Sequence, residues 1–279
     1  MAILENFPTH TLLISDVDGT LVSGGLDLPR RNLTALERFI RGGGLFALAT
    51  GRSAASAGKF AARTGVNAPC ILLNGSIIYD FGTRKVLWQA FLPPAVGDVM
   101  RTVMARFPEV GAEVYAEGNF HLLNENPWTR EHAPDKILGY VHTRPEDVPP
   151  GWNKALFTGE AEKLAQVQRL CESLPHPGWD YVYSGPLYYE MLPAGVSKGS
   201  TAKRLAEICK IPHNRVVAIG DYFNDYEMVV GAGFSAVPED SPQALRAAAG
   251  MIAGPCERGA VADLIEYLEN QTRPAGLPD

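Results

Sequence analysis

The sequence contains two pairs of closely spaced aspartates, each directly after an apolar run, a pattern that can hold a metal ion. Asp16 and Asp18 follow the first run, and Asp221 and Asp225 follow a run in the last third of the chain. Carboxylates at a buried strand end are costly unless a cation pairs with them. Together with Lys198, which opens an expected helix, they predict an oxygen-rich site suited to a hard metal such as Mg²⁺.

A third polar segment carries groups suited to a phosphate. Thr50 and the backbone amides of Gly51 and Arg52 stand near an expected helix start, where N–H groups can bind an anion. Arg52 is interpreted either as a phosphate contact or as part of a structural salt bridge. Asn74 is interpreted either as a turn residue or as a substrate contact. The sequence leaves both alternatives open.

Apolar runs that alternate with helical patterns must position these polar segments. The runs cover residues 11–14, 45–49, 70–73 and 216–219. One helix is predicted over 30–41, a second follows Ser53 and ends at Arg63, and a third is predicted over 198–210. This alternation predicts an α/β fold with a Rossmann-like, mainly parallel sheet covered by helices on both faces. The carboxyl ends of its strands would bring the polar segments to one ligand-binding edge.

The middle of the chain has a different pattern, with more aromatic residues and a clearer alternation of polar and apolar positions. Two helices are predicted there, over 95–107 and 161–174, and residues 113–116 and 181–184 alternate as half-buried strands do. We therefore expect an inserted α+β domain with a partly antiparallel sheet. The predicted division is a discontinuous core of residues 1–82 and 194–279, interrupted by an insert of residues 83–193.

Composition argues against several classes of partner. The 25 Lys and Arg residues against 31 Asp and Glu give a net charge of −6, the opposite of the basic surface of a nucleic-acid binder. No apolar stretch reaches the length of a membrane helix, and no secretory signal is visible. The four cysteines are dispersed without a C-x-x-C pair, which predicts reduced, mostly buried thiols and a cytoplasmic location. The sequence does not indicate an oligomeric state.

The sequence argues against two other catalytic motifs. Residues 195–199 match the G-x-S-x-G elbow of α/β-hydrolases, which needs an acid and then a histidine downstream. The only later histidine is His213. No aspartate lies between Ser197 and His213, and the sole acid there is Glu207 on the expected helix, so the triad order is implausible. The sequence also lacks the G-x-x-x-x-G-K-Ser/Thr motif of a P-loop nucleotide-binding protein.

The chain resembles the haloacid dehalogenase-like (HAD) superfamily of phosphatases, whose four ordered motifs match Asp16-Val17-Asp18-Gly19-Thr20, Thr50-Gly51-Arg52, Lys198 and Gly220-Asp221-x-x-Asn224-Asp225. The Asn74-Gly75-Ser76 step and the long insert resemble the Cof-type branch, whose members carry a class IIB α+β cap. One motif alone is weak, whereas four in order at suitable spacing are specific. One departure is Tyr222-Phe223, two aromatic residues expected to shape the pocket floor.

The resemblance implies a role for each matching residue. Asp16 would be the nucleophile that forms an aspartyl-phosphate, and Asp18 the general acid and then base. Thr50 and Lys198 would contact the phosphoryl group and complete the catalytic set. The substrate-binding set would be Thr50, Gly51, Arg52, Asn74 and Lys198. Mg²⁺ would be held by the Asp16 carboxylate, the Asp18 carbonyl and the Asp221 carboxylate, with Asn224 and Asp225 in support.

The expected activity is hydrolysis of a small phosphorylated metabolite, most plausibly a sugar phosphate. A phosphosugar mutase of the same superfamily is the nearest alternative, because it shares the motifs and differs only in whether water or a sugar hydroxyl takes the phosphoryl group. A non-catalytic phospholigand-binding protein is a further alternative, which the intact aspartate pair argues against. The cap offers six candidate substrate-facing residues: Glu117, Asn119, His121, Arg130, Tyr188 and Glu190.

Overall fold

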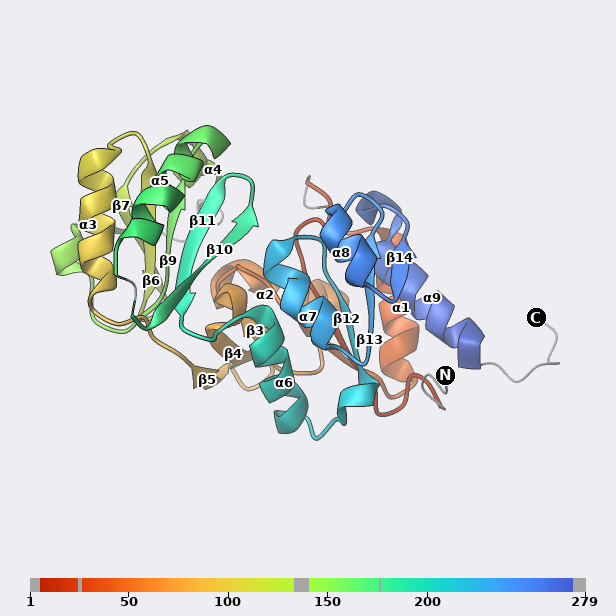
Figure 1. The fold of residues 1–279 in the computed structure, drawn as a ribbon. Helices are drawn as coiled ribbons and strands as arrows, with labels where there is room; N and C mark the ends of the chain where they lie inside the picture. The colour runs from red at the N-terminus through yellow and green to blue at the C-terminus, as the bar shows by residue number, and fades with distance from the viewer. Residues whose placement is uncertain (1–5, 25–26, 133–140, 176, 273–279) are drawn as a thin grey trace.

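The structure is a computed structural model that describes residues 6–24, 27–132, 141–175 and 177–272. It consists of a core and a cap that lie side by side, with the first and last thirds of the chain together in the core (Figure 1). Each of the four apolar runs of the sequence contains a strand, and loops that follow three of these strands contact the cap. No helix among the described residues is long and apolar enough to cross a membrane.

The core is built on a five-stranded parallel sheet with the order β14-β13-β12-β1-β2. Its strands are β1 (Leu12–Ser15), β2 (Leu45–Leu48), β12 (Val216–Ile219), β13 (Phe234–Pro238) and β14 (Met251–Ala253). All four residues of β1 are buried, as expected for a central strand covered on both faces. The parallel register of β1 with β12 places Asp16 beside the residues that follow Ile219.

Helices cover both faces of this sheet because successive strand residues point to opposite sides. The helices of the core are α1 (Arg30–Arg41), α2 (Ala54–Thr64), α6 (Lys198–Ile208), α7 (Tyr226–Gly231), α8 (Gln243–Ala248) and α9 (Ala260–Thr272). Leu13 packs in a cluster with residues of α1, α2 and α9. Its neighbours Leu12 and Ile14 pack with residues of α6 and α7.

A small antiparallel sheet lies between the core sheet and the cap. It consists of β3 (Cys70–Leu72), β4 (Ile77–Asp80) and β5 (Lys85–Gln89), and a parallel bridge between Ala49 and Ile71 joins β3 to the edge of the core sheet. Strand β5 pairs with β4 although it lies past residue 82, the last core residue expected from the sequence. The exact domain boundaries remain a prediction.

The cap contains a six-stranded sheet with the order β10-β11-β9-β6-β7-β8. Its elements are α3 (Val96–Arg106), β6 (Gly111–Ala116), β7 (Asn119–Asn124), α4 (Pro127–His132), β8 (Val141–His142), β9 (Trp152–Thr158), α5 (Ala161–Ser173), β10 (Trp179–Gly185) and β11 (Tyr188–Pro193). Its pairings are antiparallel except that of β7 with β8. Helices α3 and α5 cover one face (Figure 1), and the other face carries Tyr115, Lys154 and Glu190.

The predicted fold class is confirmed: a parallel, helix-covered α/β core with an inserted α+β cap. The predicted helix over 30–41 coincides with α1, and those over 95–107 and 161–174 match α3 and α5 to within a residue at each end. Helix α6 ends at Ile208, two residues before the predicted end, where Lys210 takes a positive φ that a helix cannot continue.

Candidate active site

The ammonium group of Lys198 lies between two buried carboxylates at the carboxyl edge of the core sheet. Its Nζ donates to Oδ1 of Asp16 at 2.6 Å and to Oδ1 of Asp225 at 2.7 Å. All three side chains are almost completely buried. The sequence motifs that are farthest apart therefore meet in one place, and Asp16 and Asp225 are held by the same cation.

Lys198 reaches this position because it is the first residue of α6. Ser197 caps the helix: its hydroxyl accepts the backbone N–H of Ser200, whose own hydroxyl accepts the backbone N–H of Ser197. Gly75 packs directly under this helix start, with a φ of +112° and room for no side chain, because a Cβ there would lie 2.4 Å from the Ser197 carbonyl oxygen. The Asn74-Gly75 step thus fixes the helix that carries Lys198.

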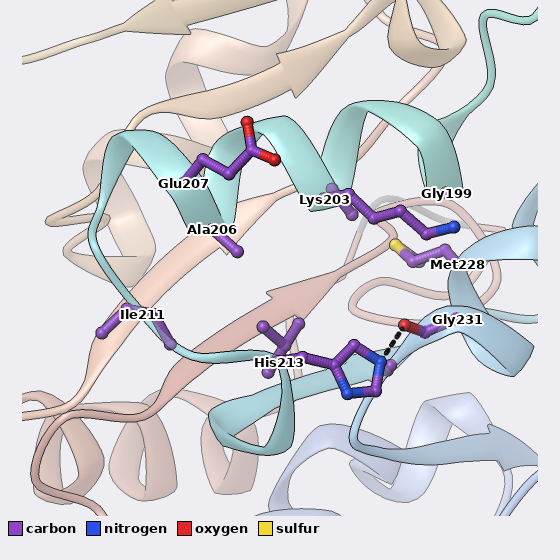
Figure 2. A pocket seen from close by; sticks show the side chains of 11 residues that line it. Gly199, Lys203, Ala206, Glu207, Ile211, His213, Met228 and Gly231 are labelled. Atoms are coloured by element: carbon purple, nitrogen blue, oxygen red, sulfur yellow. Dashed lines mark hydrogen bonds between the residues drawn. The ribbon is translucent and has the colours of Figure 1, made fainter.

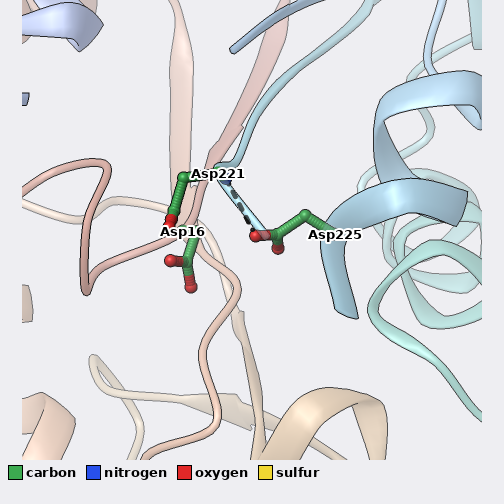
Figure 3. Close-up of side chains that lie close together, drawn as sticks. All are labelled: Asp16, Asp221 and Asp225. Carbon is green, nitrogen blue, oxygen red and sulfur yellow. Dashed lines mark hydrogen bonds between the residues drawn. The ribbon is translucent and has the colours of Figure 1, made fainter. Parts of the chain in front are cut away.

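Three aspartates form a compact acidic cluster in Figure 3. One carboxylate oxygen each from Asp16, Asp221 and Asp225 lie within 4.8 Å of one another. Asp221 accepts a 2.7 Å hydrogen bond from the hydroxyl of Thr20, which orients its carboxylate. Oδ2 of Asp225 accepts the backbone N–H groups of Asp221 and Tyr222, so both of its oxygens already have donors. Asp16 and Asp221 remain the side chains most available to a metal ion.

When all three carboxylates of this cluster are ionised, their negative charge exceeds the positive charge of Lys198. Burial raises the pKa of Asp16 well above that of an ordinary aspartate, against the opposing effect of Lys198. Burial, reinforced by the charge of Asp225, also raises the pKa of Asp221 to about 6. Burial by itself lowers the pKa of Lys198, but Asp16 and Asp225 outweigh it and the net shift is upward. A divalent cation at this point would stabilise the ionised carboxylates.

Asp18 lies outside the acidic cluster and pairs with an arginine instead. Nε and Nη2 of Arg52 donate to the two carboxylate oxygens of Asp18 at 2.7 and 2.6 Å, which makes a bidentate ion pair. Arg52 also donates to the hydroxyl of Ser56 and lies over the ring of Phe60. In this structure Arg52 adopts the salt-bridge arrangement, and its contact with phosphate remains a prediction.

The Thr50–Arg52 segment forms a tight loop at the end of β2. The hydroxyl of Thr50 is buried and accepts the backbone N–H of Arg52 at 3.2 Å. Gly51 leaves room for Asn74, whose amide would lie 3.1 Å from a Cβ at this position. The loop is thereby held against the Asn74 turn, and its polar groups lie between Asp18 and the cap.

Asn74 connects the core to the cap. It adopts a left-handed conformation with a φ of 55°, which asparagine tolerates better than most residues. Its Oδ1 accepts from Asn224 Nδ2 at 3.0 Å, and its own Nδ2 donates to Oε2 of Glu190 at 2.6 Å. Asn74 is therefore a turn residue whose buried side chain links Asn224 of the core to Glu190 of the cap. Its contact with substrate remains a prediction.

The other candidates from the cap differ in position. Glu190 is buried beside the active-site loops, while Glu117 lies exposed in the turn after β6 and Asn119 donates to its carbonyl. His121 contacts the hydroxyl of Thr143, and Arg130 pairs with Glu125 on the surface. Tyr188 is half-buried on β11. The structure brings only Glu190 to the predicted site.

Three residues that the structure brings to the site have no role in the sequence analysis: Thr20, which belongs to the first matched motif, Lys154 and Ser184. Thr20 orients Asp221, whereas Lys154 and Ser184 both bind Glu190. The signal for Lys154 was present, since it is a single charged residue within the buried strand β9. Of the aromatic pair, Phe223 is exposed and lines a cavity next to Lys198, and Tyr222 packs edge-on against it.

Two further cavities lie away from the acidic cluster. One of about 270 Å³ opens between α6 and α7 and is lined mainly by small and apolar residues, and His213 Nε2 donates there to the Gly231 carbonyl at 2.9 Å (Figure 2). The other, of about 480 Å³, lies between the β3-β4-β5 sheet and the cap and includes Ser53, Tyr115 and Glu117. None of the predicted catalytic or metal-binding residues lines either cavity.

The sequence model of a known family matches most of the chain. The model describes haloacid dehalogenase-like hydrolases and matches residues 13–265. The chain therefore belongs to the haloacid dehalogenase-like hydrolases, a family of enzymes, and the predicted resemblance is confirmed.

Several of its relatives are named as phosphatases. A putative phosphatase of Haemophilus influenzae is 23% identical over 92% of this chain and 97% of its own length. The pyridoxal phosphate phosphatase YbhA of Escherichia coli is 24% identical over 92% of this chain and 98% of its own length. An HMP-PP phosphatase of Serratia proteamaculans is 25% identical over 92% of this chain and 95% of its own length.

Solved structures share the whole fold. A haloacid dehalogenase-like hydrolase from Bacteroides thetaiotaomicron covers 92% of this chain and 99% of its own, with a TM-score of 0.81 and 24% identity. A sugar phosphatase of HAD subclass IIB covers 93% and 99%, with a TM-score of 0.80 and 18% identity. The arrangement of core and cap is therefore that of the Cof-type, class IIB branch.

Proposed function

We propose that this protein is a Mg²⁺-dependent phosphatase that hydrolyses small phosphorylated metabolites, in particular sugar phosphates, through an aspartyl-phosphate on Asp16. The observation that carries the proposal is the buried contact of Lys198 with Asp16 beside Asp221. A carboxylate held by one lysine next to a second carboxylate suits a nucleophile that must approach an anionic phosphoryl group, provided that a cation binds there.

In the first step, a carboxylate oxygen of Asp16 attacks phosphorus. The bond from Asp16 to phosphorus forms as the bond from phosphorus to the leaving oxygen breaks, and Asp18 gives its proton to that oxygen. Asp18 can donate only when it is protonated, so its bidentate contact with Arg52 must open before this step. In the second step Asp18 takes a proton from water, which attacks phosphorus and releases phosphate from Asp16.

The remaining residues position the phosphoryl group. The Thr50 hydroxyl, the Gly51 amide and the ammonium group of Lys198 would donate to its oxygens, and Arg52 would add a further donor once it leaves Asp18. Asp225 positions Lys198 and, through two backbone N–H groups, the loop that carries Asp221. These roles follow the matching motifs of the family.

The donor set fits a divalent metal ion. Three carboxylates face one ammonium group, so the fully ionised cluster carries two surplus negative charges in a buried place. Asp16, Asp221 and the backbone carbonyl of Asp18 would hold Mg²⁺, a metal that prefers oxygen ligands. When bound, the ion would neutralise charge on the nucleophile and the phosphoryl oxygens.

Two further points belong to the proposal. The phosphatase names of the relatives support phosphate-ester hydrolysis, and the sugar phosphatase of subclass IIB supports a sugar phosphate as substrate. A cytoplasmic location is supported by four free cysteines, three of them buried. Core boundaries at 1–82 and 194–279, with the cap at 83–193, complete the proposal.

The experiment is a comparison of phosphate release by the wild type, Asp16→Asn and Asp98→Asn on a panel of sugar phosphates, nucleotides and cofactor phosphates with Mg²⁺. Asp98 is an exposed cap residue and serves as the matched control. We expect Asp16→Asn to lose all turnover while its circular dichroism is unchanged. Mg²⁺-dependent turnover by this variant would contradict the mechanism.

The same panel separates the two alternatives. Conversion of one sugar phosphate into its isomer without free phosphate would identify a phosphosugar mutase. Tight binding of a phosphorylated ligand with no phosphate release from any member would identify a non-catalytic binding protein.

A further inference from the structure

Lys154 and Glu190 form a buried ion pair that joins the cap to the active-site loops of the core. Nζ of Lys154 lies 3.2 Å from Oε1 of Glu190 and donates to the carbonyl oxygen of Gly51 at 3.1 Å. Oε2 of Glu190 accepts from Asn74 at 2.6 Å, and Oε1 accepts from the hydroxyl of Ser184. One pair on the cap sheet thus contacts both the loop after β2 and the Asn74 turn.

Lys154 and Lys198 are the only lysines that are buried among the described residues. Lys198 already pairs with Asp16 and Asp225. Lys154 comes from the cap and contacts the loop that carries Thr50 and Gly51. The two lysines therefore differ in position: Lys198 contacts Asp16 in the core, and Lys154 pairs with Glu190 in the cap.

One N–H group of Lys154 has no hydrogen-bond acceptor among the residues that the structure describes. An ammonium group has three donors, and two of them go to Glu190 and Gly51, while the ring of Tyr115 lies 5.9 Å from Nζ. A buried donor without an acceptor is costly. Lys154 has no exposed surface in this structure, so a ligand oxygen that reached Nζ would give this donor an acceptor that water does not supply.

An unused acceptor lies at the other end of the same chain of contacts. Asn224 donates its Nδ2 to Asn74, but its buried Oδ1 has no partner in the described part of the chain. Asn74, Asn224 and Lys198 line a cavity of about 170 Å³ between the core and the cap. A donor and an acceptor are thus both unused within the network Lys154–Glu190–Asn74–Asn224.

We propose that Lys154 is a specificity-determining residue that donates a hydrogen bond to a hydroxyl or ether oxygen of the leaving group, and that Glu190 positions it. This inference rests on the proposed phosphatase function. Glu190 neutralises the charge of Lys154, so the pair suits an uncharged, hydroxylated group rather than a second anion. Asn224 Oδ1 can accept from another hydroxyl, which favours the phosphate ester of a polyol or sugar.

The test compares two kinds of phosphate ester in the wild type, Lys154→Met and Lys163→Met. One substrate is the best sugar phosphate of a panel that includes glucose 6-phosphate, and the other is p-nitrophenyl phosphate, whose leaving group has no free hydroxyl. Lys163→Met is the matched control, because this half-exposed cap lysine pairs with Glu109 at the surface.

We expect Lys154→Met to lower kcat/KM for the sugar phosphate about 10- to 100-fold, the range for a hydrogen bond to a charged donor. Its kcat/KM for p-nitrophenyl phosphate should fall by less than about threefold, and Lys163→Met should match the wild type on both substrates. Glu190→Gln should raise KM for the sugar phosphate more than it raises KM for p-nitrophenyl phosphate, because Glu190 acts through Lys154.

An equal loss on both substrates would overturn the inference, because Lys154 would then support the fold or the phosphate loop. No loss on the sugar phosphate would overturn it as well. If Lys154→Met fails to fold, the double variant Lys154→Met/Glu190→Leu removes the pair without leaving an unpaired buried charge and undergoes the same comparison. If the wild type releases no phosphate from any substrate, the proposed function itself fails, a result distinct from these.

Discussion

Nζ of Lys198 lies 2.6 Å from Oδ1 of Asp16, although 182 residues separate them in the sequence. The contact exists only because β1 pairs with β12 in parallel and α6 begins where the chain returns from the cap. Both partners are buried, so neither charge is compensated by water. The contact between Lys198 and Asp16 therefore forms only in the folded core, and we expect it to contribute to the stability of that core.

Removing the cation of this contact should destabilise the protein strongly. In Lys198→Met both Asp16 and Asp225 lose their buried partner, and such a loss costs about 3–5 kcal/mol of unfolding free energy. Lys203 lies on the exposed side of the same helix, so Lys203→Met should change the unfolding free energy by less than about 0.5 kcal/mol. Urea denaturation of both variants measures the difference. Equal unfolding midpoints would show that the buried contact contributes nothing net.

Asp18→Asn should separate the two chemical steps. p-Nitrophenolate leaves without a proton, so loss of the acid should spare the first step, whereas hydrolysis of the aspartyl-phosphate on Asp16 still needs Asp18 as base. We expect a rapid release of about one equivalent of p-nitrophenol per enzyme. The steady rate that follows should be lower than that of the wild type by about 100-fold or more. Stopped-flow absorbance measures both phases. A slow linear release without a burst would mean that Asp18 acts elsewhere in the reaction.

Mg²⁺ should stabilise the folded protein through Asp221. A ligand that binds only the folded state at a hundred times its Kd adds about 2.7 kcal/mol to the unfolding free energy. Thermal unfolding with and without Mg²⁺ should therefore show a clear rise in Tm for the wild type and for Asp98→Asn. Asp221→Asn should lose this rise, since it removes one of the two carboxylates available to the ion. An undiminished rise in Asp221→Asn would place the ion elsewhere.

The parts of the site carried by strand ends were predictable, because each apolar run of the sequence is followed directly by its polar segment. Asp16, Thr50 and Asp221 fall at the carboxyl edge of one sheet for that reason. A salt bridge of Arg52 is one of the two alternatives that the sequence leaves open, but the sequence does not identify Asp18 as the partner.

Contacts between the cap and the core were less predictable. Glu190 could be named as a candidate, but its partners Lys154 and Asn74 lie 36 and 116 residues away from it. No local periodicity encodes how an inserted domain docks on the core. The lone lysine in the buried strand β9 was visible in the sequence, but only the docked cap shows that it contacts Gly51.

The four cysteines should differ in reactivity in a way that depends on pH. Burial raises the pKa of Cys70, Cys171 and Cys256 to about 12 each, so almost no thiolate forms near neutral pH. Cys209 is half-buried and its pKa is raised by burial as well. With a thiol-reactive disulfide at pH 8 we expect Cys209 to react first and faster as the pH rises, and the others only on unfolding. Cys209→Ser should abolish the native-state reaction, and rapid labelling that persists in it would contradict the assignment.

Gly19 should control the affinity for Mg²⁺ through its missing side chain. It has a φ of +87°, and a Cβ at this position would lie 2.5 Å from Oδ2 of Asp221. Gly19→Ala should therefore displace the Asp221 carboxylate and weaken Mg²⁺ binding by about tenfold or more, the range seen when a group that orients a ligand is changed. The measurement is the Mg²⁺ concentration that gives half-maximal phosphate release.

Backbone strain alone must be separated from this displacement, and Gly118 provides the control. Its φ of +77° is similar, but a Cβ there meets no atom within 4 Å. Both alanine variants should lose about 1–2 kcal/mol of stability from the left-handed conformation. Only Gly19→Ala should also need more Mg²⁺, because only there does the new methyl group meet a carboxylate of the acidic cluster. If both variants have the Mg²⁺ requirement of the wild type, Asp221 does not bind the ion through the carboxylate position seen in this structure.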